Sequence, residues 1–82
     1  MVVAKSKKPA SPELGLLVRS LRELLGVSQE KLAARMGVTF SSVNRWENGH
    51  TKPSPLAVQK LEEMVLELGP EGKDLQDEFF SK

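Results

Sequence analysis

The 82-residue chain contains no cysteine, which excludes disulfide bonds and zinc sites built on thiolates. A chain without cysteine fits a reducing compartment, and we expect the cytoplasm. His50 is the only histidine, so no second imidazole or thiol can complete a metal or catalytic site with it. The sequence also lacks any apolar run near the roughly 18 residues that a membrane span needs. The basic start MVVAKSKK is not followed by the apolar region of a signal peptide.

Combinations of residues that build common catalytic sites are missing as well. The chain has no Ser-His-Asp or Cys-His set, no phosphate-binding loop and no ligands at metal-binding spacing. We therefore expect neither an enzyme nor a bound metal or cofactor. What is present is 39% hydrophobic and 28% charged residues, a balance typical of one small globular domain with a modest core.

The net charge of +1 hides an uneven distribution along the chain. Residues 1–53 carry nine Lys or Arg against four acidic residues, whereas residues 54–82 carry three against seven. A positive region attracts phosphate, and an acidic region disfavours approach of its face to DNA. Blocks of charge are also often plain solvated surface, so charge alone leaves nucleic-acid binding open.

The chain is organised around residues 28–53, SQEKLAARMGVTFSSVNRWENGHTKP. Apolar and small residues recur there with helical spacing on both sides of Gly37, which predicts two short helices packed across a tight turn. Gly37 can adopt the positive φ of a sharp helix exit, and we expect Thr39 to cap the second helix. The apolar and small positions are Leu32, Ala33, Met36, Gly37, Val38, Val43 and Trp46.

The second of these helices, near residues 39–48, has two different faces. At about 100° per residue, Val43, Trp46 and Glu47 share one face. The opposite face carries hydrogen-bonding side chains, with Phe40 at its N-terminal edge. Amide, hydroxyl and guanidinium groups can meet base edges in a major groove, and an aromatic ring can meet a thymine methyl. This pattern predicts a recognition helix whose polar face consists of Ser41, Asn44, Arg45 and Asn48.

At these residues the chain resembles the Cro and phage-repressor type helix-turn-helix family, also called xenobiotic-response-element-like regulators. The resemblance is continuous through the helix-turn-helix and extends more loosely over roughly residues 12–68. The alternative is an αα-hairpin with no nucleic-acid role. The matching residues are Ser28-Gln29-Glu30 with Leu32-Ala33, Met36-Gly37-Val38-Thr39, Ser42-Val43, Arg45-Trp46-Glu47-Asn48-Gly49 and Lys52-Pro53.

The resemblance implies an all-α, compact lambda-repressor-like fold of four or five helices. It also implies a sequence-specific regulator of transcription that binds double-stranded DNA, acts as a repressor and forms a homodimer. The implied base contacts are Phe40, Ser41, Asn44 and Arg45. The implied phosphate contacts are Gln29, Asn48, Thr51 and Lys52. An arginine at the position of Arg22 pairs in family members with the glutamate that matches Glu47, which implies a structural salt bridge.

Some of these roles have a simpler alternative. Arg45 is the strongest base-contact candidate, because a guanidinium can bond O6 and N7 of guanine together. Phe40 departs from the polar residue often found at its position, and either covers a thymine methyl or folds back onto the core. Trp46 is expected in the core and not as a stacking platform. Gln29 is alternatively an ordinary helical glutamine, and Arg22 and Glu47 are alternatively independent surface charges.

The flanking segments complete the expected organisation. Residues 1–10 form a flexible basic arm that either reaches phosphates or a minor groove or has no role. Residues 11–69 form the helix-turn-helix domain, with a first helix from the Ser11-Pro12 start to Gly26 and a fourth from Ser54-Pro55 to Gly69-Pro70. The expected inward stripes are Leu14, Leu17, Val18, Leu21, Leu24 and Leu25 in the first helix, and Ala57, Leu61, Met64, Val65 and Leu68 in the fourth.

Residues 70–82 form an acidic C-terminal tail. Leu75 and Phe79 have i,i+4 spacing, which favours a short fifth helix. Such a helix would either cap the domain or join a dimer interface. The alternative is a frayed tail without regular structure. An alternative function follows from the tail. An antitoxin-like or other protein-interaction module would bind DNA for autoregulation and hold a protein partner there. Exposure of Leu75, Phe79 and Phe80 would favour that alternative.

Overall fold

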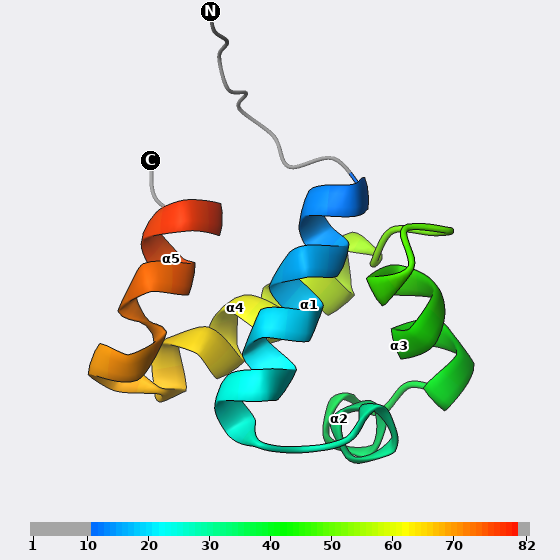
Figure 1. The fold of residues 1–82 in the computed structure, drawn as a ribbon, viewed down its shortest axis with the longest axis horizontal. Coiled ribbons are helices and arrows are strands. Elements are labelled where there is room, and N and C mark those ends of the chain that lie inside the picture. The colour runs from blue at the N-terminus through cyan, green and yellow to red at the C-terminus, as the bar shows by residue number, and fades with distance from the viewer. Residues whose placement is uncertain (1–10, 81–82) are drawn as a thin grey trace, which may run out of the picture.

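Helix α1 (Ser11–Leu25) runs through the middle of the molecule, with α3 (Phe40–Glu47) on one side and α5 (Lys73–Phe79) on the other (Figure 1). The computed structural model describes residues 11–80, so the predicted arm at residues 1–10 lies outside the described residues. All regular structure within residues 11–80 is helical, as the sequence predicts. The remaining elements are α2 (Gln29–Met36), α4 (Pro55–Glu67) and the 3-10 helix η1 (Gly69–Gly72).

Hydroxyl caps set the starts of three helices. The Ser28 side chain accepts a hydrogen bond from the Lys31 amide at 3.1 Å, and Thr39 accepts one from the Ser42 amide at 3.1 Å. Ser54 does the same at the start of α4. Each cap satisfies a backbone N–H that has no partner inside its helix. The predicted capping role of Thr39 is confirmed.

The turn between α2 and α3 depends on Gly37. This residue ends α2 in the left-handed region, with φ 74° and ψ 30°, and its N–H bonds back into the last turn of α2. A side chain would strain the backbone there, because L-residues rarely adopt positive φ. The chain therefore changes direction sharply within three residues, and the two helices lie in contact.

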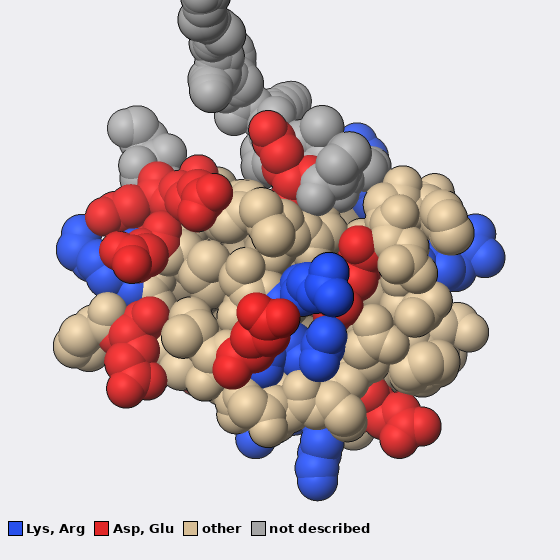
Figure 2. Space-filling view, in the orientation of Figure 1, with Lys and Arg blue, Asp and Glu red and all other residues tan. Residues whose placement is uncertain are grey.

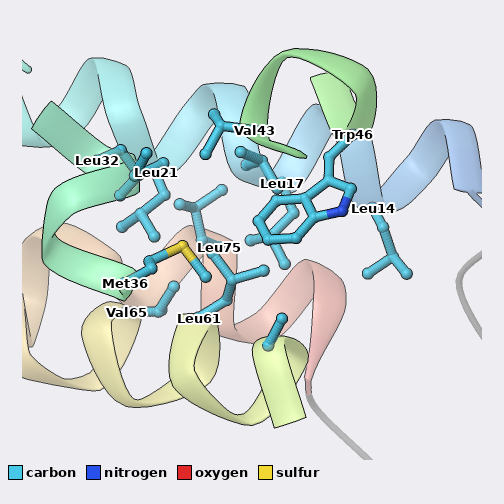
Figure 3. Close-up of a cluster of buried hydrophobic side chains, with 13 residues drawn as sticks. Leu14, Leu17, Leu21, Leu32, Met36, Val43, Trp46, Leu61, Val65 and Leu75 are labelled. Carbon is cyan, nitrogen blue, oxygen red and sulfur yellow. The ribbon is translucent and has the colours of Figure 1, made fainter. Parts of the chain in front are cut away.

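The core is built mainly from α1, α2, α3 and α4, and it includes one side chain of α5 (Figure 3). The stripe predicted for α1 is wrong at Leu24, which is 45% exposed. Periodicity sets the direction of a side chain but not how far along a helix the neighbouring elements extend. Leu56 and Leu66 lie outside the core, as expected. The buried apolar residues are Leu14, Leu17, Val18, Leu21, Leu32, Ala33, Met36, Val43, Trp46, Ala57, Leu61, Val65 and Leu75.

The acidic segment after α4 folds back onto the domain. Leu75 is 7% exposed, and Phe79 and Phe80 are half-buried against the core. Helix α5 contacts α1, α4 and η1, so it caps the domain and packing continues past residue 69. Through residue 80 the segment thus lacks the exposed apolar surface that would favour the protein-interaction alternative. Among the described residues, no helix combines the length and apolar character needed to cross a membrane.

Candidate nucleic-acid interface

The buried side of α3 rests directly on α1. Gly15 is buried in α1, where an added Cβ would collide with the backbone carbonyl oxygen of Trp46. The two backbones can approach this closely only because position 15 has no side chain. Trp46 is 6% exposed and lies in the core beside Leu14 and Leu17 (Figure 3). These contacts hold the C-terminal half of α3 in one place.

The outward side of α3 carries the candidate base-contacting side chains. Phe40 is 48% exposed and does not fold back onto the core. Ser41 and Arg45 are exposed, whereas Asn44 is half-buried. Val43 and Trp46 face the opposite way into the core, so the helix separates its two faces as predicted. The exposed set can approach a base edge or a methyl group without any rearrangement of the core.

A partly buried ion pair ties α3 to α1. The Arg22 Nε lies 2.7 Å from Glu47 Oε2, and Arg22 Nη2 donates to Glu47 Oε1 at 3.2 Å. The side chain of Glu47 is only 5% exposed, and that of Arg22 is 19% exposed. The hydrogen bond to Glu47 raises the pKa of Arg22, which outweighs the opposing effect of burial. Arg22 also donates to the Val27 carbonyl at 3.3 Å, so the pair reaches the loop before α2.

A chain of amide side chains continues from this ion pair, and the sequence pattern did not reveal it. Gln29 Nε2 donates to Glu47 Oε1 at 2.9 Å, and Asn44 Nδ2 donates to Gln29 Oε1 at 3.2 Å. Asn48 Nδ2 then donates to Asn44 Oδ1 at 3.2 Å. Two phosphate candidates, Gln29 and Asn48, are thus joined through a base-contact candidate. In the sequence, only the Asn44–Asn48 contact was indicated, because the two residues lie one helical turn apart.

The other two phosphate candidates lie in the loop after α3. His50 N donates to the Arg45 carbonyl at 2.9 Å and Gly49 N donates to the Trp46 carbonyl at 3.1 Å, and Gly49 has a φ of 77°, so this turn ends α3 and directs the chain into the loop. Thr51 is half-buried and Lys52 is exposed. Within residues 11–80, the Lys52 ammonium has no ion-pair partner. It is available to an external anion.

Most acidic residues lie in α4, η1 and α5, although the exposed Glu30 follows the phosphate candidate Gln29 in α2. Red side chains gather over α5 in the space-filling view (Figure 2), on the other side of α1 from α3 (Figure 1). The one acidic residue of α3, Glu47, is neutralised by Arg22. The exposed charge of α3 is therefore the guanidinium of Arg45. No group of three His, Cys, Asp or Glu side chains in the described part of the chain could hold a metal ion.

Comparison with known proteins points to one family. The family model described as "Helix-turn-helix" matches residues 18–64, from the middle of α1 into α4. Two relatives are named uncharacterized HTH-type transcriptional regulators, from Sinorhizobium medicae (strain WSM419) and Rhizobium meliloti (strain 1021). Each is 30% identical over 61 residues, which cover 74% of this chain and 44% of the relative, so the match spans less than half of the relative's length. No solved structure matches the chain significantly.

Proposed function

We propose that this chain, which belongs to the Cro and phage-repressor type helix-turn-helix family, regulates transcription by binding double-stranded DNA. The observation that carries the proposal is the two-sided construction of α3. Its inner side is fixed by Trp46 and by the ion pair of Glu47, and its outer side leaves Phe40, Ser41 and Arg45 exposed. A rigid helix with an unoccupied polar face suits insertion into a major groove.

In this proposal α3 reads the bases. The Arg45 guanidinium bonds O6 and N7 of a guanine, the Ser41 hydroxyl bonds a neighbouring base edge, and the Phe40 ring covers a thymine methyl. Gln29, Asn48, Thr51 and Lys52 contact phosphates on either side of the groove. Such phosphate contacts position the protein, whereas contacts to base edges specify the sequence.

We further propose that the protein binds as a homodimer and acts as a repressor by occupying its operator in the cytoplasm. Two copies of α3 related by two-fold symmetry would read half-sites about 34 Å apart, which is one turn of DNA. Selection of binding sites from random duplex DNA tests the proposal. We expect an enriched motif with two-fold symmetry. A motif without symmetry would contradict the dimer, and the absence of any enriched motif would contradict sequence-specific binding.

Replacing Lys52 by alanine is expected to weaken binding to all duplexes to a similar extent. A lysine that neutralises one phosphate releases about one counterion, so the slope of log K against log salt concentration should fall by about one. The measurement is binding affinity at several salt concentrations. Lys60→Ala, which removes an exposed lysine of α4, is the matched control and should leave the slope unchanged. An unchanged slope for Lys52→Ala would remove Lys52 from the phosphate contacts.

Replacing Arg45 by alanine is expected to reduce affinity for the selected site by about 1 to 3 kcal/mol, the usual value of a bidentate contact to guanine. Binding to scrambled duplex should weaken much less, because it does not use base contacts. Both affinities are measured at one salt concentration, with Arg35→Ala in α2 as the matched control. Equal losses on both duplexes would show that Arg45 contacts only phosphate, and would favour the protein-interaction alternative.

A further inference from the structure

A line of hydrogen bonds runs from the partly buried ion pair to the edge of the proposed DNA interface. Arg22 and Gln29 donate to the Glu47 carboxylate, Asn44 donates to Gln29, and Asn48 donates to Asn44. Each amide thus donates to the side chain before it in the line, and the first amide, Gln29, donates to the carboxylate. Aligned hydrogen bonds polarise one another, and a charged acceptor strengthens the first of them. We call these five side chains, from α1, α2, α3 and the residue that ends α3, the relay.

Asn44 is the central link of the relay. Its Nδ2 donates across to α2 at 3.2 Å, and its Oδ1 accepts from Asn48 at 3.2 Å. A bidentate contact with adenine requires the oxygen and the nitrogen of one amide to face the base together. In Asn44 these two atoms are directed at protein partners on different sides, and the side chain is half-buried. Its geometry therefore suits bridging better than reading a base.

The two partners of Asn44 are both phosphate candidates. Gln29 uses its oxygen and one N–H inside the relay, which leaves one N–H of its amide for an external acceptor. Asn48 is exposed and retains its oxygen and one N–H. Without Asn44, the side chain of Asn48 would have no link to α2, and that of Gln29 would be held only by Glu47. Ordering such a side chain upon binding costs affinity.

We propose that Asn44 is a positioning residue for DNA recognition, which acts through Gln29 and Asn48 and touches no base. By bridging them, it holds the phosphate-contacting amides of α2 and of the α3 exit in place before DNA binds. The contact between Arg45 and its base does not depend on this bridge. This inference rests on the proposed function, because it assumes that α3 contacts DNA.

A positioning residue and a base-reading residue differ in a measurable way. Asn44→Ala is expected to reduce affinity for the selected duplex about tenfold, the loss expected when one or two side chains must be ordered upon binding. On single-base-pair variants of that duplex, the relative affinities should stay as in the wild type. A base reader would instead lose its preference at one base pair. Relaxed preference at a single base pair would overturn the proposal.

A double-mutant cycle tests the link itself. If Gln29 and Asn44 act as a unit, the loss of affinity in the double alanine variant should be smaller than the product of the two single losses. Asn44→Leu, which has a similar shape without polar atoms, repeats the cycle if the alanine variant does not fold. Gln59→Ala removes an exposed amide of α4 and is the matched control, expected to combine independently with either variant.

The outcomes separate the relay from the proposed function. If the wild-type protein binds its selected duplex and the losses from Gln29→Ala and Asn44→Ala are independent, only the positioning role of Asn44 is overturned. If the wild-type protein binds no duplex, the proposed function is overturned, and the positioning role of Asn44 is overturned with it. A further readout excludes a merely structural effect. The thermal midpoint of Asn44→Leu should stay near that of the wild type while its affinity falls.

Discussion

Trp46→Ala is expected to lower the free energy of unfolding by about 3 to 5 kcal/mol, as is usual when a buried large aromatic side chain is truncated. The ring is 6% exposed and belongs to the same buried cluster as Leu14, Leu17 and Val43. Its removal leaves a cavity between α1 and α3 that this small core cannot close without moving a helix. The measurement is equilibrium unfolding in denaturant, which reports the change as a shift of the midpoint at constant slope.

Phe40→Ala is the matched control, because Phe40 is the other aromatic residue of α3 and is 48% exposed. Its truncation should change stability by less than about 1 kcal/mol. Trp46→Phe should lie between the two and provides a measurable variant if the alanine variant does not fold. Equal effects of Trp46→Ala and Phe40→Ala would contradict the assignment of Trp46 to the core.

Arg22→Ala is expected to lower the free energy of unfolding by about 3 to 5 kcal/mol, because it leaves a buried carboxylate without its counterion. Glu47 is 5% exposed and would retain only the hydrogen bond from Gln29. Removal of one partner from an exposed ion pair should change the free energy of unfolding much less. Arg19 and Glu23 lie 3.7 Å apart, and both side chains are more than 60% exposed. Arg19→Ala is therefore the matched control and should cost less than about 1 kcal/mol.

The double variant Arg22→Met with Glu47→Leu distinguishes the loss of the ion pair from the cost of leaving one charge unpaired. A buried ion pair replaced by apolar side chains of similar size often loses little stability, because the desolvation cost disappears together with the attraction. We expect the double variant to be more stable than Arg22→Ala and to bind DNA less well, since Gln29 loses its acceptor. A double-mutant cycle with no coupling between positions 22 and 47 would contradict the structural role of this ion pair.

Local features of α2 and α3 were predictable because they depend on neighbours in the sequence. The turn at Gly37 and the cap at Thr39 follow from backbone geometry within a few residues. The placement of Trp46 and Arg45 on different faces of α3 follows from a rotation of about 100° per residue. The resemblance to a known family supplied the pairing of Arg22 with Glu47, which no local pattern could have indicated. These features identify a helix-turn-helix and its polar face before any tertiary contact is known.

The amino-acid sequence by itself therefore determined the first four helices, the caps at Thr39 and Ser54 and the two faces of α3, because these are set by interactions along the chain. Only the tertiary structure decided which of the apolar side chains on these helices are buried by neighbouring helices. It left Leu24 and Phe40 at the surface, placed α5 over the core through Leu75, and explained Gly15 by the carbonyl of Trp46. It also joined Gln29 to Asn44. Such contacts link residues far apart in sequence, and their existence depends on how whole helices pack, which no periodicity specifies.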